Sequence, residues 1–194
     1  MRKSMLAIPV TLLAILTPSV VRAADITYTV NSSVGASGSM TGTITTDGNT
    51  GVLGTSDILD WNLVLNDGTN PTFTLAGMSN SAEEVLGSDL TATATQLLFD
   101  YSGGDNGFFL LENLTIGDNG PFGCFETSEA CSDAPGGVSL ATQNGEGDEV
   151  FTALEGQGVI GTVGTSPTPE PGSLFLLGTG LVGLAGMGWR RVVA

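Results

Sequence analysis

Short runs of alternating apolar and polar residues dominate the chain between residues 24 and 164. In DWNLVLN, residues 60–66, the side chains of Trp61, Leu63 and Leu65 fall on one face and polar side chains fall on the other. A period of two is typical of a half-buried β-strand. Further segments of this kind are 26–30, 39–46, 71–75, 90–101, 107–114, 137–142 and 158–163, and the apolar run 108–111 within them predicts a central strand.

Turn residues separate these runs, chiefly Asp47-Gly48, Asn66-Asp67-Gly68, Gly103-Gly104, Asp118-Asn119-Gly120 and Asn144-Gly145. Gly, Asn and Asp accept positive φ and are typical of hairpins and tight turns. Residues 79–87, SNSAEEVLG, predict one helical turn, which is too short to change the fold class. Eight or more short strands in one domain predict an all-β fold, an antiparallel β-sandwich that includes the jelly roll among its forms.

Residues 1–23 predict a secretory signal peptide. Arg2 and Lys3 precede an apolar stretch, and the small residues Val21 and Ala23 place signal peptidase cleavage between Ala23 and Ala24. The alternative is an uncleaved anchor, which is disfavoured because the apolar stretch is shorter than the ~20 residues of a membrane helix.

The C-terminal region divides into a proline-rich spacer, residues 165–172, and a predicted transmembrane helix with a basic tail, residues 173–194. Residues 173–189 carry no charge, and as a helix they would extend about 26 Å at ~1.5 Å per residue. Trp189 suits the membrane interface, and Arg190 with Arg191 supplies cytoplasmic positive charge. The intervening domain, residues 24–164, is then exported.

The order Pro169-Glu170-Pro171, glycine-rich apolar helix, Arg190-Arg191 resembles the C-terminal sorting signal of PEP-CTERM proteins. The resemblance implies recognition by an exosortase, a membrane enzyme of bacteria that export polysaccharide. An ordinary single-pass anchor is the alternative, but a plain anchor has no use for the proline-glutamate-proline triplet. Segments within residues 42–102 also resemble a β-rich ectodomain found among PEP-CTERM proteins, which implies no catalytic residue.

Charge is distributed very unevenly in this chain of formal net charge −15. All five basic residues lie near the two ends, and no Lys or Arg lies between Ala24 and Trp189. Binding to nucleic acid or to an anionic membrane surface depends on Lys and Arg. The sequence therefore excludes nucleic acid as a partner of the exported domain.

Cys124 and Cys131 are the two cysteines of the chain. In an exported protein such a pair predicts a disulfide, which for a loop of this length contributes about 2.5 kcal/mol. A metal or redox pair is the alternative, disfavoured because the spacing is not C-x-x-C and the chain has no histidine.

Catalytic chemistry is restricted by the absence of histidine and of any lysine after Lys3. A Ser-His-Asp triad, a histidine-ligated zinc site and a Schiff-base lysine are excluded. Paired carboxylates could still hydrolyse a glycosidic bond. The candidates for such a pair are Glu112, Glu126, Glu129, Glu146, Asp148 and Glu149.

Asp47 and Asn49 imitate the start of a calcium-binding loop. The position that needs a bidentate glutamate holds Ile58, so a plain hairpin turn is favoured over calcium. The acidic pairs Asp105-Asn106 and Asp118-Asn119 carry the same ambiguity.

The sequence therefore predicts an exported, non-enzymatic protein, held by its C-terminal helix and then delivered to the cell surface or the extracellular matrix. Its expected role is a structural or polysaccharide-binding component without a cofactor. The alternatives are a carboxylate-dependent carbohydrate enzyme and a calcium-dependent adhesin.

Overall fold

The computed structural model describes residues 23–104, 106–114, 120–128, 131, 136–143 and 149–164. The predicted signal peptide up to residue 22, the spacer and the predicted transmembrane helix lie outside the described residues.

Two antiparallel sheets make up the domain. The strands are β1 (Ile26–Val34), β2 (Gly38–Thr46), β3 (Gly51–Val52), β4 (Ile58–Asn66), β5 (Phe73–Ala76), β6 (Ser81–Leu86), β7 (Leu90–Ala92), β8 (Gln96–Asp100), β9 (Phe108–Asn113), β10 (Phe122–Glu126), β11 (Gly137–Ala141), β12 (Val150–Ala153) and β13 (Gln157–Val163). Two short 3-10 helices, η1 (Thr55–Asp57) and η2 (Gly77–Ser79), lie between strands.

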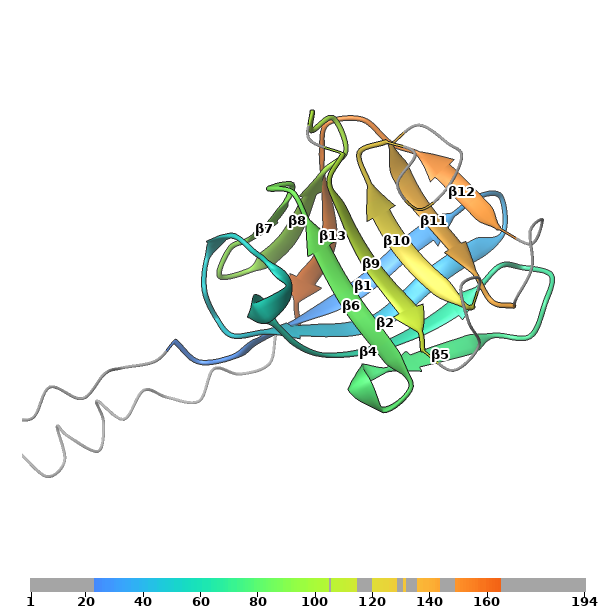
Figure 1. The fold of residues 1–194 in the computed structure, drawn as a ribbon, viewed down its shortest axis with the longest axis horizontal. Helices are drawn as coiled ribbons and strands as arrows, with labels where there is room; N and C mark the ends of the chain where they lie inside the picture. Colours follow the sequence, from blue (N-terminus) through green and yellow to red (C-terminus); the bar gives the residue numbers. More distant parts are fainter. Residues whose placement is uncertain are drawn as a thin grey trace, which may run out of the picture.

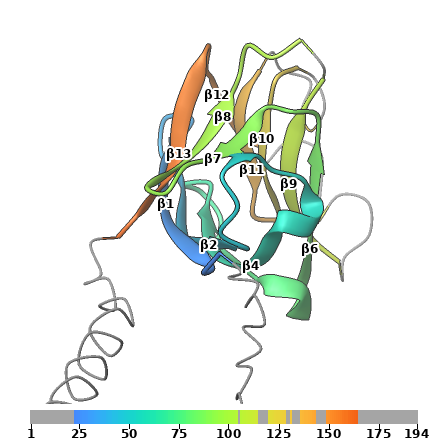
Figure 2. The same ribbon diagram turned by 90° about the vertical axis from the view of Figure 1, so that its left-hand side faces the viewer.

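One sheet has eight strands in the order β3-β7-β8-β13-β1-β2-β4-β5, and the other has five in the order β12-β11-β10-β9-β6. Figure 1 shows β6, β9, β10 and β11 in front of β1, β2 and β4, and Figure 2 shows the two layers from the side. The predicted all-β antiparallel sandwich is confirmed.

The core lies between the two sheets. Trp61, Leu63 and Leu65 of β4 are buried there, as the alternation in the sequence predicts. From the smaller sheet, the rings of Phe109 and Phe125 stack with their centroids 6.0 Å apart. Each large apolar side chain that is buried in this way contributes about 1.5–3 kcal/mol to folding.

The predicted central strand at 107–114 is confirmed as β9, which lies between β6 and β10. Residues 90–101 do not form one strand. The hydroxyl of Thr93 accepts hydrogen bonds from the backbone N–H groups of Thr95 and Gln96, at 3.2 and 2.8 Å. This local turn divides the segment into β7 and β8.

The prediction of a helical turn at 79–87 is wrong, because Ser81–Leu86 forms β6 and pairs with β9 over its whole length. Ser81 is fully buried, and its hydroxyl accepts a hydrogen bond of 2.8 Å from Nε1 of Trp61. These long-range contacts override the helical tendency of the Ala-Glu-Glu segment.

The Asp47-Gly48 turn is not part of a simple hairpin. β2 pairs with β4, whereas β3, which follows the turn, pairs with β7. The backbone N–H of Asp47 bonds to the carbonyl of Asp57 at 3.0 Å, which closes the base of this excursion. Residues 47–57 therefore leave the sheet after β2, place β3 at the far edge beside β7, and return to begin β4 next to β2.

Side chains cover the free edges of two strands. The amide of Asn80 accepts a hydrogen bond from the N–H of Ala76 at 2.7 Å and donates one to the carbonyl of Thr74 at 2.8 Å, both on β5. The hydroxyl of Thr55 bonds in the same way to the N–H and the carbonyl of Val85 on β6, at 2.9 and 3.4 Å. Covered edges do not recruit a further strand.

Candidate functional site

Hydroxyl and amide side chains cover the outer face of the eight-stranded sheet. Along β1, β2 and β4 the inward positions are buried except for the half-buried Ile26, Ser32 and Gly42, and the alternate, outward positions are exposed or half-buried. We call these outward polar positions the hydroxyl face. They are Thr27, Thr29, Asn31, Ser33, Ser39, Thr41, Thr43, Thr45, Asn62, Asn66, Thr74, Gln96 and Thr162.

The hydroxyl face is in register across strands. Gln96 on β8 opposes Thr162 on β13, Thr162 opposes Thr29 on β1, Thr29 opposes Thr43 on β2, and Thr43 opposes Asn62 on β4. With strands about 4.8 Å apart, this row of five polar side chains extends about 19 Å. Parallel rows lie about 6.7 Å to either side along the strands.

The side chains of the hydroxyl face are held by the sheet. Seven of its members are threonines, whose branched Cβ restricts χ1. In the neighbouring row the hydroxyls of Thr27 and Thr45 lie 2.8 Å apart in a hydrogen bond across β1 and β2. A side chain that is ordered before binding loses little entropy when a ligand arrives.

Charge is nearly absent from this face. Among the outward positions of β1, β2, β4, β5 and β8, the ionisable residues are Asp60 on β4 and Asp100 at the end of β8. A second row lies beside the face and crosses β3, β7, β8 and β13. It consists of Val52, Thr91, Leu98 and Val159, which are in register. Val52 and Val159 are 60% and 50% exposed, so this apolar row is open to solvent.

Sequence reasoning did not identify the hydroxyl face. Its strongest signal is the alternate threonines Thr41, Thr43 and Thr45 of β2. The pairing of Thr29 with Thr162 joins residues from opposite ends of the domain, and no local pattern reveals it.

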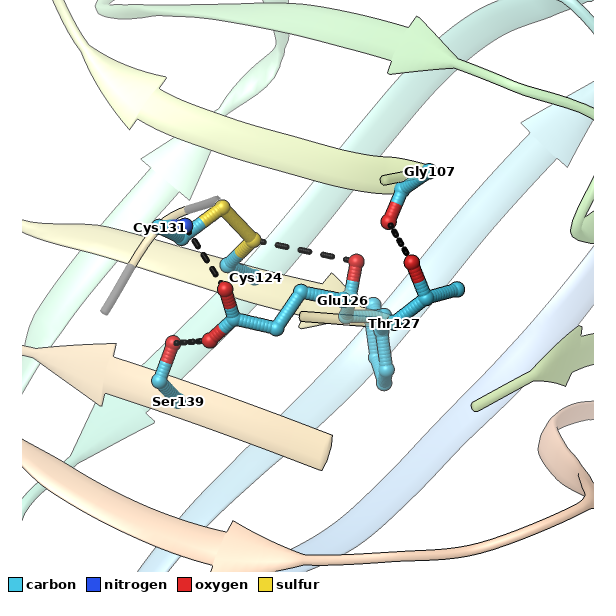
Figure 3. Close-up of a disulfide and its surroundings, with 7 residues drawn as sticks. Gly107, Cys124, Glu126, Thr127, Cys131 and Ser139 are labelled. Carbon is cyan, nitrogen blue, oxygen red and sulfur yellow. Dashed lines mark hydrogen bonds between the residues drawn. A yellow bond between two sulfur atoms is a disulfide. The ribbon is translucent and has the colours of Figure 1, made fainter. Parts of the chain in front are cut away.

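The predicted disulfide between Cys124 and Cys131 is present, with Cα atoms 6.4 Å apart. Figure 3 shows the buried carboxylate of Glu126 beside it, between the disulfide and Ser139. The N–H of Cys131 donates to Oε2 of Glu126 at 2.7 Å, and the hydroxyl of Ser139 donates to Oε1 at 3.4 Å. The carboxylate therefore holds Cys131, the last residue of the disulfide loop, beside β10 and β11.

The sulfurs of Cys124 and Cys131 and a carboxylate oxygen of Glu126 lie within 4.8 Å of one another. Two thiolates and a carboxylate suit a zinc ion. In the structure the two sulfurs are bonded to each other, so this group acts as a cross-link.

The candidate catalytic acids are scattered. Glu112 on β9 is exposed, Glu126 on β10 is fully buried, and Glu149 is exposed before β12. Glu112 opposes Phe122, four residues from Glu126 along β10, so the two acids are about 13 Å or more apart at ~3.3 Å per residue. Glycoside hydrolysis requires a separation of about 5–10 Å. Glu129, Glu146 and Asp148 lie outside the described residues.

Asp47 and Asn49, the calcium candidates, form a local turn. The backbone N–H of Asn49 donates to Oδ1 of Asp47 at 3.0 Å, and its side-chain amide donates to Oδ2 at 2.6 Å. Both carboxylate oxygens thus already accept hydrogen bonds from within the turn. Asn106 has a positive φ of 50°, and Asp105, Asp118 and Asn119 lie outside the described residues.

Asp67, directly after β4, is buried, and its surroundings change its pKa. Burial by itself raises the pKa of Asp67. Hydrogen bonds from Thr142, Asn70 and Thr69 outweigh burial and hold that pKa below its usual range. The bond from the Thr142 hydroxyl is 2.6 Å long and joins the ends of β4 and β11, which belong to different sheets.

Within the part of the chain that the structure describes, no helix has the length and apolar character needed to cross a membrane. The predicted sorting residues Pro169, Glu170, Pro171, Arg190 and Arg191 lie outside the described residues.

Comparison with known proteins gives one positive result. No curated protein and no solved structure matches the chain, so the resemblance of residues 42–102 to an ectodomain group stays a prediction. Residues 167–192 match the PEP-CTERM protein-sorting motif, and this range contains every predicted sorting residue. The chain therefore carries a PEP-CTERM protein-sorting motif behind its β-sandwich domain.

Proposed function

We propose that this protein is a non-enzymatic component of the cell surface or extracellular matrix that binds polysaccharide through its hydroxyl face. The sorting motif supports the coarser part of this statement, an exported protein that an exosortase processes. In the proposal, signal peptidase removes residues 1–23, and the C-terminal helix holds the protein in the membrane until exosortase acts.

The observation that carries the proposal is the row Gln96, Thr162, Thr29, Thr43 and Asn62, which crosses five strands in register. A hydroxyl donates one hydrogen bond and accepts two, and a side-chain amide both donates and accepts. Sugar hydroxyls have the same capacity. A regular row of such groups offers a polysaccharide several hydrogen bonds at once.

The chemistry of the face favours binding over catalysis. Its two carboxylates, Asp60 on β4 and Asp100 on β8, are four strand spacings or about 19 Å apart, too far for the pair of acids that glycoside hydrolysis requires. Glu112 and Glu126 are too far apart along their sheet to act together. We therefore rank the carboxylate-dependent enzyme below the binding protein.

The arrangement of the chain ends agrees with delivery from a membrane. β1, near the start of the domain, pairs with β13, at its end, and Tyr28 opposes Val163. The chain thus enters and leaves the sandwich side by side, so both ends of the domain can stay close to one membrane while it folds.

Co-sedimentation tests the proposal. Full-length protein in detergent would be mixed with exopolysaccharide from the producing cells, and both bound protein and released reducing sugar would be measured. We expect bound protein and no release of sugar. Absence of binding would contradict the proposal, and sugar release that one Asp or Glu substitution abolishes would favour the enzyme.

A further inference from the structure

The hydroxyl face and its apolar neighbour point to a particular class of polysaccharide, and this inference rests on the proposed function. We infer that the ligand is an uncharged, extended glycan that lies flat on the eight-stranded sheet. Thr29, Thr43 and Asn62 supply the central hydrogen bonds to it.

The charge of the domain selects against an anionic glycan. The described residues contain no Lys or Arg that could pair with a carboxylate or sulfate group of a ligand. The chain has twenty acidic residues, and its net charge is −15. A polyanion would be repelled without compensation, although salt would reduce the repulsion.

A neutral glycan can bind the face without electrostatic repulsion. Hydroxyl and amide groups satisfy sugar hydroxyls as donors and as acceptors, and no charge has to lose its hydration. Asp60, opposite Thr45, and Asp100, at the end of β8, both lie outside the row of Thr29, Thr43 and Asn62.

The adjacent apolar row can contact the faces of the sugar rings. Pyranose rings present C–H groups on their faces and hydroxyls around their edges. Val52, Leu98 and Val159 run across four strands in register with Thr91, next to the polar rows. A glycan on this sheet can bury ring C–H groups there while its hydroxyls bond to the threonines, and such apolar burial is favourable.

Extension of the ligand follows from the regularity of the sheet. Polar side chains repeat about every 4.8 Å across the strands in the row of Thr29, Thr43 and Asn62, and about every 6.7 Å along β1 and β2, whereas on β4 the exposed Val64 lies between Asn62 and Asn66. An extended chain keeps its hydroxyls at a constant repeat and can meet successive positions. A compact or highly branched glycan meets only a few.

The test measures dissociation constants of full-length protein in detergent for soluble probes at one ionic strength. The neutral probes are linear mannan and soluble cello-oligosaccharides, the branched neutral probe is glycogen, and the anionic probe is alginate. The face variant is Thr29→Val/Thr43→Val, which removes two hydroxyls and keeps the branched Cβ that the strands favour. The matched control is Thr50→Val/Thr72→Val, at exposed positions outside the face.

We expect a neutral linear probe to bind more tightly than alginate and glycogen. The face variant should lose about tenfold in affinity, as two hydrogen bonds of ordinary strength predict. The control should bind as the parent does, and circular dichroism and melting should show that all three proteins are folded. The variant Thr43→Lys should bind alginate more tightly than the parent, because it adds a cation to the face.

Three outcomes would each contradict a different part of the inference. If alginate binds as tightly as any neutral probe, the neutral class is wrong and the proposed polysaccharide-binding function stands. Equal affinity of the face variant and the parent would show that the ligand binds elsewhere. If no probe and no native exopolysaccharide binds, the proposed function fails together with this inference.

Discussion

Thr142→Val removes one hydrogen bond at the junction of the two sheets. The Thr142 hydroxyl donates to Oδ2 of Asp67 at 2.6 Å, and Asp67 is only 2% exposed. Valine has nearly the same shape as threonine but has no donor. The carboxylate keeps its other hydrogen bonds, from the backbone N–H groups of Thr69 and Asn70 and from the Asn70 side chain.

The expected loss follows from the charge of the acceptor. A hydrogen bond to an ionised group contributes about 1.5–3 kcal/mol to the free energy of unfolding. For a protein of this size each kcal/mol corresponds to about 2–4 °C of melting temperature, so the variant should melt about 3–12 °C lower at neutral pH.

The loss should depend on pH in a definite direction. In the folded parent the pKa of Asp67 lies below its usual range, so its ionised form stabilises the fold at every pH above the unfolded value near 3.9. This contribution falls as the pH drops below that value toward the folded pKa. The gap in unfolding free energy between parent and variant should therefore be full at pH 7 and smaller at pH 3.

Urea unfolding of the full-length protein at the two pH values measures this gap. The matched control is Thr69→Val, because Thr69 contacts Asp67 through its backbone N–H, which the substitution keeps. An equal gap at pH 7 and pH 3, or a loss at pH 7 no larger than that of Thr69→Val, would refute the reasoning.

Two further substitutions test steric and edge effects. In Gly107→Ala the new Cβ would lie 1.9 Å from Oδ2 of the buried Asp89, whereas in Gly104→Ala it would meet nothing within 4 Å. We expect the first to lower the unfolding free energy by about 1–3 kcal/mol and the second to change it little, as measured by urea unfolding; equal effects would contradict the steric argument. Thr55→Val removes both side-chain bonds to the free edge of β6 at Val85, so light scattering should show association that rises with concentration. A variant that stays monomeric across the same range would show that the edge is protected in another way.

The sequence predicted the fold class because apolar and polar residues alternate wherever one face of a strand is buried and the other is exposed to solvent. DWNLVLN is the clearest case, since each of its inward residues lies in the core and each outward one is exposed or half-buried. The period fails for β10, Phe122–Glu126, where residues on both faces are buried, including the carboxylate of Glu126. That strand is recognised only from its pairing with β9 and β11.

The candidate site was harder to predict than the fold. Thr27, Thr29 and the threonines of β2 are visible as alternating polar residues, but alternation alone assigns them to solvent. Whether they form a continuous row depends on the strand order, because β13 places Thr162 between Gln96 and Thr29. The sorting signal, in contrast, could be identified from the sequence alone, because residues 167–192 form a linear motif whose recognition does not depend on residues far away in the chain.

Intact mass spectrometry of the native protein released from the cell surface tests the central claim most directly. If the chain is exported and sorted as its motif indicates, the mature protein should begin at Ala24 and end between residues 166 and 172. Replacement of Glu170 by Ala should then leave the full-length form in the membrane fraction. Released protein that still contains Trp189, or normal processing of the Glu170→Ala variant, would contradict the account.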